Sequence, residues 1–444
     1  MSLLSGGLLG SRRRNPGSAV ASWARHPDWL PLPVIGPTEE KFVGLFGVTN
    51  DSANFVALLA QGDYTVDWGD GTVENHDSFA VASHQYDYAA IPNGTLCSRG
   101  YKQVIITVTP REWATFTRID LQRRHPSMTQ NYAPMWLDLA LGSPNLVWMK
   151  LGGWDLSLQF VERVKIVSVG NVTSTDSLYN SMTALEVVND FNTANVTDAS
   201  YMYMSCDRIK NVPAHNLSSC LYFTSFFENC SCLEVAPAIN TAMGQDFSRF
   251  YYNCKALREA PALNTANGTN FNEMHRNNHA LLDIPAYTLA SAQTARYMLS
   301  ACNSAKACPN FNTPNLTDAE GMFDNMHNLQ FGPVLDLSQA TNCARLFNNC
   351  YSLVHIPPYE LSSSLANGFI LEACTSLSKG AMTGTKVSIE YKNMRLGAAE
   401  LNAIFAGLAT GVTGQTIDIT GNFGASDPAC DRSIATLKGW TVVG

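Results

Sequence analysis

Cysteine and histidine are the residue types whose chemistry depends most on spacing, and this chain contains two suggestive pairs. Cys230 and Cys232 form a C-x-C pair, a spacing that could hold a metal ion or support redox exchange. His275 and His279 have the i, i+4 spacing that places two imidazoles on one face of a helix, as in zinc sites. No glutamate follows His275, so the H-E-x-x-H pattern is absent. Whether either pair is reactive depends on the elements that position it.

The segment around Cys230 belongs to a repeat with a period of 24 residues. One column of this repeat holds Met182, Cys206, Cys230, Cys254, Asn278, Cys302, Met326, Cys350 and Cys374. An apolar residue lies three positions after each member, from Leu185 to Leu377, and another lies four positions before, from Leu178 to Ile370. A proline follows the middle seven members by seven residues, from Pro213 to Pro357. Columns that stay in register in this way indicate a solenoid with a continuous buried core.

The repeat changes how both pairs are interpreted. The Cys230 column also accepts Asn and Met, which thiolate chemistry could not tolerate, so we interpret its cysteines as buried free thiols. His275 shares a column with Tyr251 and Phe323, which indicates a core position. We therefore predict no metal site, no cofactor and no catalytic residues, and hence a protein that is not an enzyme.

Each turn should contain a short strand that ends near the proline and a return segment. The return segments often begin with threonine, namely Thr173, Thr197, Thr269, Thr317 and Thr341. Such residues would cap a helix of one or two turns that carries the Met/Phe column. For residues 171–385 the fold class predicted is thus a leucine-rich-repeat solenoid, with a parallel β-helix as the alternative. The cycle resembles the BspA-like repeats of bacterial and viral surface proteins.

The segment before the repeats divides into an extended arm, a strand-rich region and a transition. Residues 1–38 contain five prolines and no apolar period, which predicts the extended arm. Residues 39–110 alternate like strands, and Asp70-Gly71 within DYTVDWGDGT predicts a tight hairpin. Residues 111–170 would form a linker and the N-terminal cap of the solenoid.

The strand-rich region and the C-terminal segment each carry a further indication of their fold. The WGDG stretch, followed by His84-x-Tyr86 and the strand 104–109, resembles the polycystic-kidney-disease (PKD) domain, an immunoglobulin-like β-sandwich. Such domains serve as spacers and display modules, so the resemblance implies that role here. Residues 386–444 are expected to form a C-terminal cap of strands and two helices.

The arm is basic, although the whole chain has a formal net charge of −8. Its candidate partner-binding residues are Arg12, Arg13, Arg14, Trp23, Arg25 and Trp29. The alternative is that the tryptophans cover the next domain. An acidic body argues against nucleic acid as a partner, and no apolar run approaches the ~20 residues that a membrane helix needs. The arginines follow the first apolar stretch, the wrong order for a secretory signal, so we expect synthesis in a cytoplasm without export.

A second candidate surface is a charged stripe on the columns just before the prolines. It comprises Lys210, Glu234, Arg258, Glu259, Asp283, Lys306 and His355. These side chains could contact a ligand, or they could simply form a mixed-charge solvated face. A polysaccharide-degrading role would require carboxylates within ~5–10 Å across one groove.

The two termini carry the resemblance that bears most on function. Arg25-His-Pro-Asp-Trp-Leu-Pro-Leu-Pro33 and the strands after it resemble the opening of bacteriophage virion structural proteins. The ending TIDITGN…ACDRSIATLKGWTVVG resembles the cap of repeat proteins in phage tails. Together they imply a tail or tail-fibre protein of the virion, anchored by its arm and displaying its repeats for adsorption to a host. Implied partners are other virion proteins, further copies of the chain, and a host-surface receptor or polysaccharide. A capsid decoration protein and a bacterial surface adhesin are the alternatives.

Overall fold

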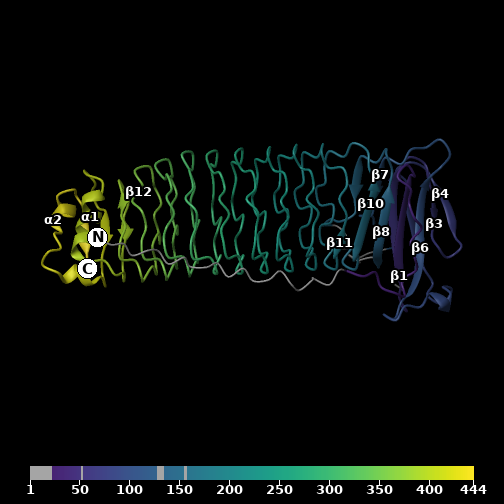
Figure 1. The fold of residues 1–444 in the computed structure, drawn as a ribbon, viewed down its shortest axis with the longest axis horizontal. Helices are drawn as coiled ribbons and strands as arrows, with labels where there is room; N and C mark the ends of the chain where they lie inside the picture. The colour runs from purple at the N-terminus through teal and green to yellow at the C-terminus, as the bar shows by residue number, and fades with distance from the viewer. Residues whose placement is uncertain (1–22, 52–53, 128–134, 155–157) are drawn as a thin grey trace, which may run out of the picture.

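A computed structural model describes residues 23–51, 54–127, 135–154 and 158–444. Figure 1 shows an elongated molecule in which a region of β-sheet runs into a long series of stacked turns, with two helices at the far end. The sheet region contains β1 (Lys41–Val48), β2 (Phe55–Gln61), β3 (Tyr64–Asp67), β4 (Val73–His76), β5 (Val81–Gln85), the 3-10 helix η1 (Asn93–Thr95), β6 (Lys102–Pro110), β7 (Arg118–Asp120), β8 (Trp136–Gly142) and β9 (Trp148–Lys150). The stacked turns include β10 (Arg163–Ser168), β11 (Val187–Val188), β12 (Tyr359–Glu360) and β13 (Met382–Thr383). The C-terminal end holds β14 (Ile389–Glu390), α1 (Ala398–Gly407), β15 (Thr416–Asp418), the 3-10 helix η2 (Phe423–Ser426), α2 (Ser433–Thr436) and β16 (Thr441–Val443).

Two sheets form the N-terminal region. A seven-stranded sheet has the order β11-β10-β8-β1-β6-β3-β4, and a four-stranded sheet has the order β5-β2-β7-β9. Apolar residues of both sheets, such as Phe46 of β1 and Leu58 of β2, belong to one buried cluster. Strands β7 to β9 fall within residues 111–170. The assignment to the PKD family stays a prediction, because the sheets alone do not identify it.

The predicted hairpin at Asp70-Gly71 joins β3 to β4. Gly69 has a φ of 80°, and a Cβ atom there would lie 2.4 Å from the carbonyl oxygen of Ile105, so only glycine fits. The Asp67 carboxylate accepts a hydrogen bond from the Gly69 N–H group at 2.9 Å. Asp70 accepts one from the Thr72 N–H group at 3.0 Å. Both carboxylates therefore hold the turn.

Both sheets continue into the solenoid. β10 pairs in parallel with β8, and β11 pairs in parallel with β10, so one sheet becomes one wall of the stacked turns. The other wall starts from β9, after which the N–H group of Gly152 donates to the carbonyl oxygen of Leu178 at 2.7 Å. One buried cluster extends from Phe42 to Trp440. The sheets, the turns and the C-terminal end therefore share a continuous core.

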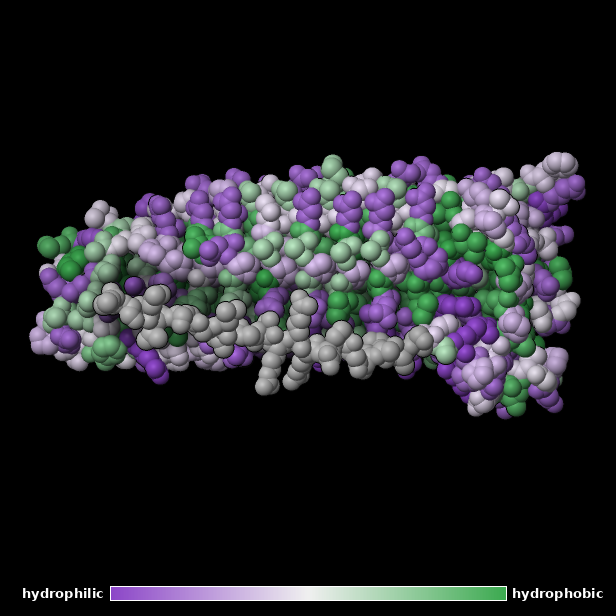
Figure 2. Space-filling view, in the orientation of Figure 1, coloured by the Kyte–Doolittle hydropathy of each residue, from purple (hydrophilic) through white to green (hydrophobic). Residues whose placement is uncertain are grey.

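The predicted columns form that core. Parallel bridges join residues 24 apart, and one ladder runs through Ser174, Asp198, Tyr222, Asp246, Asn270, Thr294, Asp318, Asn342 and Ala366. The Met/Phe column and the cysteine column are both fully or almost fully buried. The predicted solenoid with its repeat of 24 residues is thus confirmed. In Figure 2, hydrophilic side chains form rows along the solenoid, and hydrophobic residues gather where it meets the sheets.

The predicted helix in each turn is wrong. Across the described residues 171–385 the structure contains no helix, and the segment of each repeat that carries the Met/Phe column forms consecutive tight turns. Some of its N–H groups bond to the next turn of the solenoid, as when Tyr203 donates to the carbonyl oxygen of Phe226 at 3.0 Å, and others bond within their own turn. The Thr317 and Thr341 hydroxyls donate to carbonyl oxygens one turn earlier, at 2.9 and 3.1 Å, rather than capping a helix. The fold is a β-solenoid, which lies closer to the parallel β-helix alternative.

Left-handed residues explain why no helix can form in these turns. Every fourth residue of each return segment has positive φ, as at Tyr201 (58°) and Ser205 (56°). This conformation interrupts any right-handed helix. The column just before the cysteines is rich in asparagine, the residue other than glycine that tolerates it best.

The C-terminal end closes the solenoid. Strands β14, β15 and β16 pair in parallel, and α1 and α2 lie beside them (Figure 1). Trp440 is 2% exposed, and its indole N–H donates to the carbonyl oxygen of Ala409 at 2.9 Å. In the described part of the chain, none of the helices has the length and apolar character needed to cross a membrane.

Candidate functional site

The arm residues that the structure describes lie on the outer face of the seven-stranded sheet. Trp29 is 4% exposed and packs against Leu45 and Leu137, and its indole N–H donates to the hydroxyl of Tyr101 at 2.8 Å. Trp23 is half-buried, with the Arg163 guanidinium 5.4 Å from its ring centre. The tryptophans therefore cover the sheet, as in the alternative considered above.

A buried aspartate fixes this half of the arm. The Asp138 side chain has no exposed surface and lies 2.7 Å from Arg25 and 2.7 Å from Arg163. A buried carboxylate flanked by two guanidinium groups stays charged and hydrogen-bonded. Loss of either arginine would leave its buried negative charge only partly balanced, which would destabilise the fold. Arg25 thus serves the packing of the arm. Arg12, Arg13 and Arg14 lie outside the described residues, and their partner-binding role stays a prediction.

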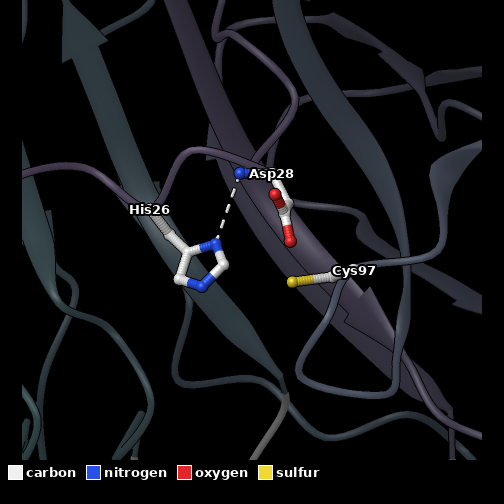
Figure 3. Close-up of side chains that lie close together, drawn as sticks. All are labelled: His26, Asp28 and Cys97. Atoms are coloured by element: carbon white, nitrogen blue, oxygen red, sulfur yellow. Dashed lines mark hydrogen bonds between the residues drawn. The ribbon is translucent and has the colours of Figure 1, made fainter.

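Three possible metal ligands meet where the arm touches the sheet region. Figure 3 shows His26, Asp28 and Cys97, whose donor atoms lie within 4.8 Å of one another. Hydrogen bonds between protein groups already occupy two of them. Asp28 accepts from the Ser98 N–H group at 3.1 Å, and the Asp28 N–H group donates to His26 Nδ1 at 3.3 Å. Hydrogen bonds from the Ser98 side chain and from its backbone N–H group lower the pKa of Asp28. These contacts account for the arrangement as part of the docked arm.

The cysteine column is a ladder of buried hydrogen-bond donors. The thiols of Cys206, Cys230, Cys254, Cys302, Cys350 and Cys374 donate to backbone carbonyls of the preceding turn at 2.9–3.2 Å. All are free. Burial raises the pKa of Cys302 and Cys374 to about 12, so these thiols stay protonated and unreactive. The structure confirms that Cys230 is a core residue, and Cys232 beside it is half-buried.

The histidines in the core also serve packing. His215 accepts from the hydroxyl of Tyr203 at 2.5 Å and donates to Asp190 at 2.8 Å, an order that resembles a proton relay. However, Tyr203 has no exposed surface, and burial raises its pKa well above the ordinary value. No substrate can reach that hydroxyl, so the relay has nothing to act on. His275 is likewise fully buried, and it does not form a pair with the exposed His279.

The charged stripe lies on the wall that continues the seven-stranded sheet. Lys210, Glu234, Arg258 and Lys306 share one column, and Glu259, Asp283 and His355 share the next. Six of them are exposed and His355 is half-buried, and no ion pair joins any two of these seven described side chains. Exposed Val235, Leu282 and Phe331 interrupt the stripe. It is thus a mixed surface, and its contact with a ligand stays a prediction.

The opposite wall carries a more structured surface, which we call the left-handed strip. It consists of Ser177, Tyr201, Ser225, Arg249, Glu273, Tyr297, Gly321, Arg345 and Phe369, all with positive φ. Such a backbone costs an ordinary residue roughly 1–2 kcal/mol. Tyrosine, arginine and phenylalanine have no preference for it. We infer that these residues are present for the contacts of their side chains.

Those contacts run from turn to turn. Arg249 lies 2.6 Å from Glu273. The Tyr297 hydroxyl donates to Glu320 at 2.8 Å, and the ring of Tyr297 covers Gly321 so closely that a Cβ atom there would lie 2.3 Å from it. Side chains of the strip therefore contact those of neighbouring turns through ion pairs, hydrogen bonds and ring faces.

Ser177 and Ser225 are small members of this strip, and a hollow lies over each. The first hollow has a volume of about 250 Å³ and is lined in part by Trp148, Lys150, Trp154, Asp176, Ser177 and Tyr201. The second has about 330 Å³ and is lined in part by Trp154, Tyr201, Thr224, Ser225, Arg249 and Glu273. We call the two adjoining hollows the aromatic groove. Trp154 and Tyr201 separate them, with ring centres 5.7 Å apart and an interplanar angle of 75°.

The aromatic groove has an exposed ring, a ring held in place by a guanidinium group, and a carboxyl group, a combination that suits contact with a ligand. Trp154 is 64% exposed. The Arg118 guanidinium lies 3.5 Å from the ring centre of Trp148 and holds that ring. Burial and the charge of Asp198 raise the pKa of Asp176. Sequence reasoning missed this groove, because Trp148 and Trp154 lie in the segment interpreted as a linker. The one available signal was serine in a column of large side chains.

In the comparison with known proteins, only the repeat region of the chain has a match. Residues 155–260 and 225–332 match a family described as a Mycoplasma protein of unknown function, DUF285. The matched residues fall in the solenoid and the segment that leads into it, and the match agrees with the resemblance to BspA-like repeats. No curated protein is significantly similar to the chain. In its repeats, therefore, the chain is similar to this family.

Proposed function

We propose that the protein is a non-enzymatic structural protein of a bacteriophage particle, a tail or tail-fibre component whose solenoid adsorbs to a host surface. The observation that carries the adsorption role is the division of side chains in the solenoid. Its cysteines are mostly buried and hydrogen-bonded, whereas the wall opposite the charged stripe exposes the rings of Trp154 and Phe369 and the ion pair between Arg249 and Glu273. Large exposed aromatics beside polar groups mark recognition surfaces.

The continuous core supports a display role. Because Phe42 and Trp440 belong to one buried cluster, the sheets and the repeats share one core, as display of the repeats from an anchored end would require. The attachment role is assigned to Arg12, Arg13 and Arg14, since Arg25 and Trp29 are used in docking the arm. The virion assignment itself rests on the resemblance of the two ends of the chain to phage structural proteins.

A bacterial surface adhesin is the second candidate, favoured by the match of the repeats to a family described from Mycoplasma. Antibodies against the purified chain distinguish the two. Immunogold electron microscopy of purified phage particles should show label on the tail. Label on the capsid would indicate a decoration protein, and label confined to the surface of bacteria that release no particles would establish the adhesin and contradict the virion proposal.

A further inference from the structure

The aromatic groove has a regular spacing set by the solenoid. Ser177 and Ser225 are two turns apart in one column, so the hollows above them are separated by roughly 10 Å if neighbouring turns stack at strand spacing. Tyr201 lies between them and is shared by both hollows. The surface thus offers two sockets in line along the solenoid axis, with an aromatic wall between them.

The groove combines apolar ring faces with short polar groups. Trp148, Trp154 and Tyr201 supply the rings. Thr224 and Ser225 supply hydroxyl groups beside the second hollow, which can both donate and accept hydrogen bonds. Asn272 supplies an amide N–H donor, because its side-chain oxygen already accepts from Thr294 and Arg296. A ligand that fits must present a flat apolar face together with a rim of hydroxyl groups.

Two other ligand classes fit less well. An extended peptide that adds to a sheet needs free backbone groups. In the groove, the N–H groups of Tyr201 and Ser225 already donate to Thr224 and Ser248 of the next turn, each at 2.8 Å. A phosphate-rich ligand such as nucleic acid would meet the carboxylates of Asp176 and Glu273. Of the two basic side chains in the lining, Arg249 is paired with Glu273 and Lys150 interacts with the charge of Asp176.

We propose that the aromatic groove binds a polysaccharide segment that runs along the solenoid axis, with pyranose rings seated against Trp154 and Tyr201. The C–H face of a pyranose stacks on an aromatic ring, while its hydroxyl groups reach Thr224, Ser225 and Asn272. This inference rests on the proposed adsorption function and deepens it, because it assigns both the ligand class and the site.

Substitutions can test the groove without changing the core. Trp154→Ala and Tyr201→Ala remove the aromatic wall. Ser225→Tyr fills the second hollow, and the fold should accept it because the same column already holds Tyr201 and Tyr297 with positive φ. Trp113→Ala is the matched control, since Trp113 is 94% exposed and lines neither hollow.

The experiment uses the labelled full chain on an array of bacterial capsular polysaccharides, lipopolysaccharide O-chains and teichoic acids, with envelope proteins from the same cells as separate spots. We expect binding to at least one polysaccharide. Each groove variant should weaken it about tenfold or more, equivalent to ~1.4 kcal/mol, and Trp113→Ala should not. The proton NMR spectrum of each variant confirms its fold.

Three other outcomes overturn the proposal in distinguishable ways. Polysaccharide binding that the groove variants leave unchanged would place the sugar site elsewhere. Binding to envelope proteins alone would overturn the ligand class but leave the adsorption function standing. A chain that binds no envelope material would contradict the adsorption function itself.

Discussion

The imidazole Nε2 atom of His275 lies 2.7 Å from the hydroxyl oxygen of Tyr287, inside the core of the solenoid. Three turns earlier, the same two columns hold the reverse pair, in which Tyr203 and His215 are 2.5 Å apart. In these two turns each polar ring thus satisfies the other, whereas the buried hydroxyls of Tyr179 and Tyr251, in the column of Tyr203 and His275, face apolar residues and have no hydrogen-bond partner. Because a buried polar group without a partner costs stability, the exchange shows one way in which the repeat admits a histidine into its core.

The first prediction concerns acid. Burial lowers the pKa of His275 to about 3, whereas the unfolded chain takes up this proton near pH 6.5. The unfolded state therefore binds more protons between these values. Stability is present above pH 6.5 and should fall as the pH drops towards 3, by up to ~1.4 kcal/mol per pH unit.

The control for this prediction replaces the pair by residues found in neighbouring turns. The control variant combines His275→Phe with Tyr287→Phe. Both new residues already occur in these columns, at Phe323 and at Phe311. The difference in melting temperature between pH 7 and pH 4 should shrink relative to the wild type. An unchanged difference would show that His275 does not contribute.

The second prediction concerns alkali. The buried thiols of Cys302 and Cys374 have pKa values raised to about 12, but an unfolded thiol ionises near 8.5. Above that pH the unfolded state has lost a proton that the folded state keeps, so stability should decline as the pH rises. Replacing both cysteines by alanine should reduce the loss of unfolding free energy between pH 8 and pH 10.5, measured by urea denaturation. A decline as steep as that of the wild type would refute this.

The third prediction compares the two cysteines of the C-x-C pair. Cys230→Ala removes a buried sulfur and leaves the carbonyl oxygen of Tyr203 without the thiol that donates to it at 3.1 Å. The free energy of unfolding should fall by about 1–3 kcal/mol. Cys232→Ala, at a half-buried position, should change it by no more than about 0.5 kcal/mol. Equal effects in thermal denaturation would contradict the core assignment of Cys230.

The fourth prediction concerns the docked arm. Trypsin can cut after Arg25 only if this side chain leaves Asp138. Trp29→Ala removes a ring that packs on Leu45 and Tyr101, a change that costs about 3–5 kcal/mol in a core. Cleavage at Arg25, followed by mass spectrometry, should therefore accelerate strongly. Trp113→Ala is the control, and equal cleavage of wild type and Trp29→Ala would show that the arm is not held by this ring.

The repeat was predictable because burial in a solenoid repeats with the chain period. The columns of Met202 and Cys206 were identified as core from their spacing alone. The same spacing misled the prediction of a helix. Residues four apart share one face of a helix, but they also share one side of consecutive tight turns that are closed by left-handed residues such as Tyr201 and Ser205. Periodicity cannot separate the two conformations.

The candidate site was much less predictable. The charged stripe follows from a column pattern, and the structure does place it on one wall. The aromatic groove instead depends on Trp148, Trp154 and Tyr201, which come together only because β9 continues into the turns of the solenoid. No sequence spacing encodes that juxtaposition. The docking of Arg25 on Asp138, which is 113 residues away, is hidden for the same reason.

Adsorption of the purified full chain to host cells tests the central claim most directly. Labelled chain should bind cells saturably, and excess unlabelled chain should slow the adsorption of phage particles to the same cells. If the chain neither binds nor competes at concentrations that saturate the array, the protein does not recognise the host surface, and the proposed function is wrong.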